Sequence, residues 1–423
     1  MSSTEIFERR ESAVRSYCRN LDAVLVGGRG SVVWDTDGHE YLDFLAGAGA
    51  LNYGHNDPDM KRALLDYISG DGIAHGLDLH TEAKRSFLER FEQIILEPRG
   101  MSHRVQFTGP TGANAVEAAM KLARKATGRA NIISFTRGFH GLSNGALAAT
   151  ANSTMRGGPV NALSGVFRLP YDGYLGPDVD TADLLELMLA DPSSGLDAPA
   201  AILLETVQGE GGLNVASSRW LRRIAALASA HGALLIIDDI QAGCGRTGTF
   251  FSFEPAGITP DIVVLSKSLS GFGLPMSVLL TRPEIDVWEP GEHTGTFRGN
   301  GHAFVTATVA LEKFWSNGAL AADVTRRAEA LTGRLTEIAK GIPGARLKGR
   351  GLMQGIEVDP ALAAQIARTC IRERLIIERA GPHDEVVKVL APLTTPDEVL
   401  DRGLDILAAA AGEAVRATFP VSA

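Results

Sequence analysis

The sequence predicts an α/β protein in which a large, mostly parallel sheet domain is followed by a smaller α+β domain. Two observations carry this prediction. The middle of the chain alternates short apolar runs with amphipathic helical patterns, and the pattern changes after about residue 315. Strands that are apolar throughout are typical of a parallel sheet covered by helices on both faces. A chain of 423 residues is long enough for two domains without disulfide or metal cross-links.

Short strands and helices alternate in the middle of the chain. A strand over residues 105–107 ends in a glycine-rich turn, and a helix is expected over 114–127. The other expected strands cover 131–135, 201–205, 233–238, 262–266 and 277–281, with an amphipathic helix over 218–231. Ligands of such sheets bind at the carboxyl ends of the strands.

The C-terminal part of the chain follows a different order. A long helix over 319–338 precedes a strand over 351–359, a further helix and an extended piece over 386–393, and an alanine-rich helix is expected over 404–415. This order is typical of an α+β domain. The sequence therefore predicts an N-terminal segment (1–65) that packs with the small domain, a large domain (66–315) and a small C-terminal domain (316–423).

Charge and cysteine usage argue against several classes of protein. The chain carries 41 Lys and Arg against 50 Asp and Glu, and this net charge of −9 disfavours a nucleic-acid binder. The chain has an odd number of cysteines, Cys18, Cys244 and Cys370, and their spacing is not that of metal ligands. We therefore expect neither a disulfide framework nor a metal site. The charged N-terminus lacks signal-peptide character and no apolar run reaches about eighteen residues, so we expect a cytoplasmic protein without a membrane span.

Two polar side chains at the ends of buried strands carry the first chemical signal. Lys267 directly follows the strand IVVLS, where burial would lower its pKa and make the amine nucleophilic, although an isolated lysine there more often extends to the surface. Asp238 ends the strand ALLII, with Ile240 on the same side and Asp239 on the other. A buried carboxylate at this place either has a cationic partner, such as a protonated pyridine nitrogen, or caps the following turn.

Two turns add a phosphate cradle and an aromatic ring. Residues 108–124, TGPTGANAVEAAMKLAR, open a helix with glycines, and the free N–H groups of a helix start bind phosphate. This segment has neither P-loop nor dinucleotide spacing. Phe139, in GFHG, could stack on a flat ring, although a lone Phe there is more often part of the core. Together with Lys267 and Asp238 these features describe pyridoxal phosphate, with Ile240 on the opposite ring face and Gln241 at the phenol oxygen.

The same motifs resemble a known family. The segments DDIQAGCGRTG and LSKSLSGFGLP resemble the signature of class III (omega) aminotransferases, and the resemblance extends over nearly the whole chain. It implies PLP fold type I, like aspartate aminotransferase, with a large, mostly parallel seven-stranded sheet domain. The segments GAGALNYGHNDP, DGIAHGLDLHTEAK and PGEHTGTFRGN resemble more narrowly the diaminobutyrate–2-oxoglutarate aminotransferases. Members of that family make L-2,4-diaminobutyrate for ectoine, siderophore or peptide synthesis.

The resemblance implies a ping-pong reaction in which L-glutamate donates its amino group and leaves as 2-oxoglutarate, and L-aspartate 4-semialdehyde receives the group. Lys267 matches the lysine that holds the cofactor as an imine and moves the proton, and Asp238 matches the pyridinium partner. The other matched positions are Gly112 and Ala113 at the phosphate, Phe139 and His140 in the FHG element, Ile240, Gln241, and Thr296, which reaches the phosphate of the neighbouring subunit. The last match implies a homodimer with shared active sites, by itself or within a higher assembly.

Two positions depart from the family pattern. Glu210 matches a glutamate that pairs with a C-terminal arginine in many class III enzymes and separates from it when a dicarboxylate binds. Lys388 stands at the arginine position, and because lysine is a point charge and not a bidentate fork, the usual switch is in doubt. The alternative is that Lys388 is a surface charge. Asn114 replaces an acid beside the phosphate, and Arg298 and Lys388 are the candidates for the distal carboxylate of the substrate.

Other activities fit part of this pattern. A class III enzyme for ornithine, acetylornithine or 4-aminobutyrate would carry the same motifs, and a semialdehyde aminomutase shares the fold but needs no second substrate. A regulator without turnover is disfavoured because the lysine, the aspartate and the glutamine are all present and no DNA-binding segment is appended. A nicotinamide oxidoreductase is disfavoured by the glycine spacing.

Overall fold

The structure, a computed structural model, describes residues 4–157 and 163–419. Its largest sheet has seven strands in the order β4-β12-β11-β10-β7-β5-β6. Only β12 runs antiparallel to its neighbours, so the sheet is mostly parallel, which confirms the expected fold class. The strands are β4 Arg104–Phe107, β5 Ile132–Phe135, β6 Val166–Leu169, β7 Ala201–Leu204, β10 Leu234–Asp238, β11 Ile262–Leu265 and β12 Val278–Thr281.

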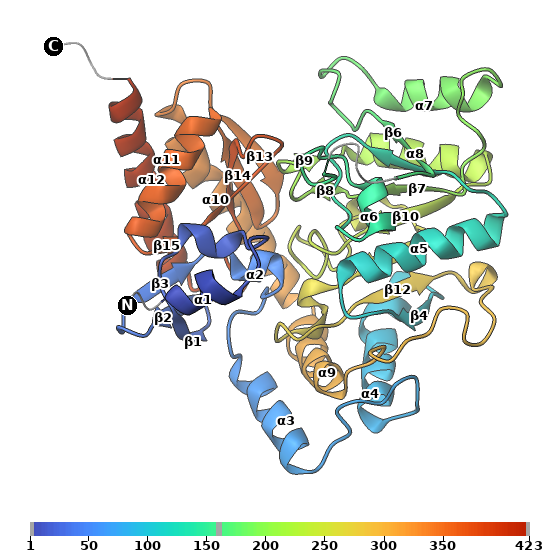
Figure 1. Cartoon of the computed structure of the whole chain (residues 1–423), viewed down its shortest axis with the longest axis horizontal. Helices are drawn as coiled ribbons and strands as arrows, with labels where there is room; N and C mark the ends of the chain where they lie inside the picture. Colours follow the sequence, from blue (N-terminus) through green and yellow to red (C-terminus); the bar gives the residue numbers. More distant parts are fainter. Residues whose placement is uncertain (1–3, 158–162, 420–423) are drawn as a thin grey trace.

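Helices cover both faces of this sheet, as Figure 1 shows. In β10, Leu235 and Ile237 belong to the core under one face, and Ile236 between them belongs to the core under the other. This alternation explains why the strand is apolar throughout. The helices of this part are α3 Pro58–Ser69, α4 Glu82–Phe91, α5 Gly112–Thr127, α6 Asn144–Ala149, α7 Thr181–Ala190, α8 Ser218–Ala230 and α9 Gly301–Trp315. The sequence pattern does not reveal β6, because Arg168 interrupts its apolar run.

The second part of the molecule combines both ends of the chain. In Figure 1 the N-terminal strands lie against the C-terminal helices. β3 pairs in parallel with β15, and Leu42 and Phe44 belong to the same core as the C-terminal helices. One sheet consists of β1 Leu25–Arg29, β2 Val32–Asp35, β3 Glu40–Asp43 and β15 Leu375–Ile376. The other consists of β13 Arg346–Arg350, β14 Met353–Glu357, β17 Val386–Val389 and β16 Glu378–Ala380.

The remaining elements complete this arrangement. The C-terminal helix α12 begins at Asp397, earlier than 404, because Pro396 precedes the acidic first turn formed by Asp397 and Glu398. β17 ends at Val389, so the extended piece is shorter than expected. A two-stranded ribbon, β8 Val207–Gln208 and β9 Asn214–Val215, holds the loop that carries Glu210. The other helices are α1 Glu5–Arg10, α2 Ala46–Gly49, α10 Ala319–Lys340, α11 Pro360–Arg372 and α12 Asp397–Thr418. Within 4–157 and 163–419, no helix has the length and apolar character of a membrane span.

Candidate active site

Lys267 lies at the carboxyl end of β11, at the start of a 3₁₀ turn over Lys267–Ser270. Its φ of +50° is in the left-handed region, which a side chain other than Gly adopts at a cost, and such strain is concentrated at functional sites. The amine Nζ donates a hydrogen bond to the carbonyl oxygen of Ala48 (2.9 Å). Burial lowers the pKa of Lys267 and the charge of Glu210 opposes this shift, so the neutral, nucleophilic amine is favoured relative to an exposed lysine.

Asp238 is the last residue of β10 and Asp239 follows it, and the two side chains have different partners. Oδ2 of Asp238 accepts a hydrogen bond from Nδ1 of His140 (2.8 Å), and both side chains are buried. Burial would lower the pKa of His140, but its hydrogen bond with Asp238 and the charge of Asp238 raise it. Asp239 accepts hydrogen bonds from the backbone N–H (3.0 Å) and the hydroxyl of Ser252, and burial raises its pKa to about 7. Asp238 therefore lies beside His140, and Asp239 fastens the turn that follows.

Glu205, directly after β7, connects two loops of the site. Its carboxylate accepts hydrogen bonds from the backbone N–H groups of Phe139 (3.0 Å) and Gly209 (3.1 Å). Burial raises the pKa of Glu205 to about 7, although the charge of His140 opposes the shift. The position of Phe139 is thus linked to the loop of Glu210 through one buried carboxyl group.

The start of α5 forms a close-fitting cradle. Thr111 caps the helix by accepting a hydrogen bond from the N–H of Asn114 (3.4 Å), and Gly112 is the first helical residue. A Cβ on Gly112 would lie 2.7 Å from Cδ1 of Ile240, and a Cβ on Gly141 would lie 2.6 Å from Cβ of Ala113. The absence of side chains at these two positions lets the helix start approach the strand ends, where its N–H groups can meet an anion.

Gln241 joins this cluster to Glu210. Its Nε2 donates to the carbonyl oxygen of Ala48 (3.0 Å), the same atom that accepts from Lys267, and to Oε1 of Glu210 (3.4 Å). Its Oε1 is buried and has no hydrogen-bond partner among the described residues. A buried acceptor without a partner is costly, so a hydroxyl of a bound ligand would satisfy it.

Glu210 belongs to a buried charged cluster with Lys388 and Glu378. Nζ of Lys388 lies 3.1 Å from Oε1 of Glu210 and 2.8 Å from Oε1 of Glu378, and the lysine side chain is fully buried. Lys388 is therefore not a surface charge. Burial alone would lower the pKa of Lys388, but the two carboxylates raise it above its ordinary value.

A cavity of about 460 Å³ opens beside these groups. Phe139, Glu210, Arg137, Arg168 and His383 are among its lining residues. The guanidinium of Arg137 lies 5.6 Å from the ring centre of Tyr174, and Nε of Arg168 has no hydrogen-bond partner among the described residues. The cavity therefore combines an aromatic ring, a carboxylate and basic groups, which suits an amino acid with carboxylates.

Thr296 and Arg298 lie apart from this cluster within one chain. Both belong to the loop before α9, where Thr296 is exposed. Arg298 lines a different cavity, of about 230 Å³, together with Gln106 and Trp288, and its Nε and Nη1 have no partners among the described residues. Among the described residues, neither side chain forms a hydrogen bond or ion pair with Lys267 or Glu210 of its own chain.

Sequence reasoning missed Glu378, Glu205 and Tyr17. Glu378 is directly opposite Lys388 in the antiparallel pair of β16 and β17, a register that the sequence does not reveal. Partial burial and then the charges of Glu210 and Glu378 raise the pKa of Tyr17 to about 12, so this N-terminal residue lies near the same cluster. Of these three residues, only Glu205 could have been found from the sequence, because it directly follows an apolar strand, as Lys267 does.

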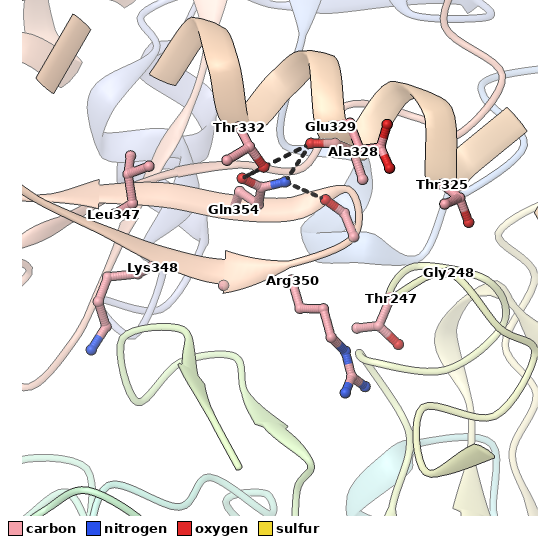
Figure 2. A pocket seen from close by; sticks show the side chains of 12 residues that line it. Thr247, Gly248, Thr325, Ala328, Glu329, Thr332, Leu347, Lys348, Arg350 and Gln354 are labelled. Carbon is pink, nitrogen blue, oxygen red and sulfur yellow. Dashed lines mark hydrogen bonds between the residues drawn. The ribbon is translucent and has the colours of Figure 1, made fainter. Parts of the chain in front are cut away.

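A further pocket, of about 420 Å³, lies between α10 and the hairpin β13–β14. Figure 2 shows Gln354 held under the helix, where it accepts from Thr332 and donates to the carbonyl of Ala328. Arg350 extends toward the loops of the large sheet and donates to the carbonyl of Ser252 (2.6 Å). None of the residues that line this pocket belongs to the cluster around Lys267, so this is not the site described above.

The cluster around Lys267 fits pyridoxal phosphate. A helix start suits its phosphate, the Asp238–His140 pair suits its ring nitrogen, Gln241 offers an unpaired acceptor to its hydroxyl, and Lys267 offers an amine to its aldehyde.

Comparisons with known proteins agree with this chemistry. The sequence model of the family described as class III aminotransferases matches residues 15–411. A diaminobutyrate–2-oxoglutarate transaminase of Vibrio cholerae is 57% identical over 406 residues, covering 95% of this chain and 98% of the relative. The one of Bordetella parapertussis is 54% identical over 422 residues, covering 99% and 97%. The crystal structure of ornithine aminotransferase from Toxoplasma gondii has a TM-score of 0.84 at 26% identity, covering 98% of this chain and 95% of that chain.

Proposed function

The chain belongs to the class III aminotransferase family, and we propose that it transfers the amino group of L-glutamate to L-aspartate 4-semialdehyde, giving L-2,4-diaminobutyrate and 2-oxoglutarate. The observation that carries the reaction type is the buried amine of Lys267, which shares the Ala48 carbonyl with Gln241 beside Glu210. The choice of substrates is supported by the names of relatives that are 54–57% identical over nearly their whole length. We propose that the product serves ectoine, siderophore or peptide synthesis in the cytoplasm.

Class III aminotransferases use pyridoxal phosphate. We propose that the N–H groups at Gly112 and Ala113 hold the phosphate and that Phe139 and Ile240 pack on the two ring faces. Asp238, supported by His140, would hold the protonated ring nitrogen, and Gln241 would contact the ring hydroxyl. When bound, the cofactor supplies an electron-withdrawing ring that stabilises negative charge on the substrate carbon.

The proton transfer at the substrate carbon is the role that we propose for the amine of Lys267. With the cofactor bound, the free amine Nζ of Lys267 would take a proton from the α-carbon of L-glutamate. In the second half-reaction the same Nζ delivers a proton to the C4 carbon derived from the semialdehyde. Burial supports this role because it lowers the pKa of the free amine and thereby favours the neutral base. We propose Lys388 and Arg298 for the distal carboxylate of the substrate, and Glu210 as the ion-pair partner of Lys388 beside it.

We propose that the protein acts as a homodimer in which Thr296 reaches the phosphate site of the partner. The loop before α9 lies beside the segment 73–79, since His75 and Asn300 form a bridge and the rings of His75 and Phe297 are 5.3 Å apart. Exposed apolar side chains gather in these two segments: Ile73, Leu77, Leu79 and Phe297. Such a group on a globular protein is typical of an interface.

The test is the visible absorption of the purified holoenzyme during stepwise addition of substrates. L-Glutamate is expected to remove the band of the lysine-bound cofactor, and aspartate semialdehyde is expected to restore it, with diaminobutyrate released. A protein that ignores glutamate but responds to ornithine, acetylornithine or 4-aminobutyrate would keep the family and overturn the substrate. Turnover of a semialdehyde without an added amino donor would indicate an aminomutase instead.

A further inference from the structure

The buried cluster of Glu210, Glu378 and Lys388 contains more negative than positive charge. Lys388 of β17 pairs with Glu378 of β16, its direct neighbour across the antiparallel pair, and with Glu210 from the β8–β9 loop. Burial raises the pKa of Glu378, whereas the charge of the adjacent Lys388 lowers it; when both carboxylates are ionised, these three residues carry one net negative charge. Buried ions are normally paired with an opposite charge, because desolvation is costly. An excess charge at this place therefore indicates a functional role.

The cluster is adjacent to the amine that acts on the substrate. Oε1 of Glu210 lies 3.4 Å from Nε2 of Gln241, and Gln241 and Lys267 donate to the same carbonyl oxygen, that of Ala48. Glu210, Lys388 and Glu378 all act electrostatically on Lys267. We therefore expect a charge in the cluster to change the electrostatic potential at the reacting carbon, from which Lys267 would take the proton.

The two amino compounds of the proposed reaction differ at that carbon, and the inference rests on this proposed function. L-Glutamate reacts at its α-carbon, which carries a carboxylate. Diaminobutyrate reacts at C4, which carries none, and its carboxylate lies three bonds away. We propose that Glu378 is a specificity-determining residue whose negative charge disfavours a carboxylate on the reacting carbon and thereby sets the balance between the two amines.

Glu378 suits this role better than Glu210. Glu210 approaches Gln241 and comes from a loop, so replacing it changes contacts with the site as well as charge. Glu378 lies behind Lys388 in a strand and contacts none of the groups proposed for the cofactor. Its effect on the substrate is therefore electrostatic, and it acts through Lys388 and Glu210.

The test compares Glu378→Gln with the wild-type holoenzyme in the two half-reactions. The ratio of kcat/KM for L-glutamate to that for L-2,4-diaminobutyrate is expected to rise about tenfold, because one nearby negative charge is removed in a poorly screened site. Glu378→Asp keeps the charge and is expected to restore the ratio to near the wild-type value. Glu357→Gln is the matched control and should leave the ratio unchanged, because Glu357 lies on β14 of the same sheet, separated from β16 by β17, and pairs with Arg346 and Lys348.

The outcomes separate the inference from the proposed function. A ratio that stays constant or falls in Glu378→Gln overturns the inference, as does an equal loss with both amines, which would assign Glu378 a purely structural role. If Glu378→Gln fails to retain its cofactor band, Glu378→Leu removes the same charge with an apolar side chain, and its ratio decides. A wild-type enzyme that converts neither amine would instead overturn the proposed function.

Discussion

At the scale of single residues, the site depends on buried groups whose protonation is shifted by their surroundings. Lys267 lies in a strained left-handed conformation and its amine is held by one carbonyl oxygen, that of Ala48. Asp238 and Asp239 are neighbours in sequence but differ in partner, since one pairs with His140 and the other with Ser252. The same residue type therefore faces the proposed cofactor in one case and fastens the following turn in the other.

Lys267→Ala would remove the amine that we propose both to bond the cofactor and to move the proton. We expect kcat for the glutamate half-reaction to fall by at least about a thousandfold. Single-turnover absorption measurements with reconstituted cofactor would show this. Lys340→Ala, an exposed lysine paired with Glu337, is the control and should keep full activity. A Lys267→Ala protein that converts glutamate at the wild-type rate would contradict the mechanism.

The raised pKa of Asp239 predicts a pH dependence of stability. Burial raises this pKa to about 7 from an ordinary value of 3.8, so the folded state binds more protons than the unfolded state between these pH values. The free energy of unfolding should therefore fall as the pH rises from about 4 to 7, with an upper bound of about 4 kcal/mol for this group. Urea unfolding across this range would measure the slope.

Asp239→Asn is the matched variant for this slope. It should flatten the slope, because the amide keeps an acceptor for the N–H of Ser252 and has no proton to lose in this range. Asp191→Asn, at an exposed position, should leave the slope as in the wild type. An unchanged slope in Asp239→Asn would show that the carboxyl group is already ionised throughout the range.

At the scale of elements, strand ends were predictable and pairings between strands were not. Lys267 and Asp238 directly follow or end apolar runs, so the sequence itself indicates that they lie at one edge of the sheet. The contact of Lys388 with Glu378 depends on the register of β16 and β17, and the contact of Lys267 with Ala48 joins residues 219 positions apart. Contacts of this kind, between charged side chains or with carbonyl oxygens, leave no periodic pattern in the sequence from which they could be predicted.

The start of α5 predicts the effect of a side chain at Gly112. Gly112→Val would place a Cβ 2.7 Å from Cδ1 of Ile240 and force the helix start away from the strand ends. We expect the dissociation constant of pyridoxal phosphate to rise at least about tenfold, as measured by fluorescence titration of the apoenzyme. Gly318→Ala, where a Cβ meets no atom within 4 Å, should leave the affinity unchanged. Equal affinities in both variants would exclude the cradle as the phosphate site.

At the scale of the whole molecule, two separate cores meet around the site. Leu235 and Ile237 belong to the core of the large sheet, and Leu42 and Phe44 belong to the core that contains the C-terminal helices. Lys388 and Glu378 come from the second part, whereas Glu210 and Lys267 come from the first. Charged contacts thus join the two parts at the place where the substrate is expected to bind.

The apolar side chains of residues 73–79 and Phe297 predict a dimer interface. Phe297 is 68% exposed in the single chain, and Phe297→Glu should weaken dimerisation at least about tenfold, because a charge would be buried there. Sedimentation at several concentrations would measure this, and activity should fall with the dimer fraction if sites are shared. Leu187→Glu, on the exposed face of α7 and 67% exposed, is the control. A dimer unaffected by Phe297→Glu would place the interface elsewhere.

The pairing of β3 with β15 has a consequence for synthesis on the ribosome. The N-terminal strands emerge first, but β3 gains its partner only when Leu375 has been translated, and Phe44 reaches its core only with the C-terminal helices. The large sheet, whose strands lie between these segments in sequence, can fold during translation. Strands β1 to β3 are thus translated before the large sheet but are buried after it, and they are open to chaperones and proteases in the interval.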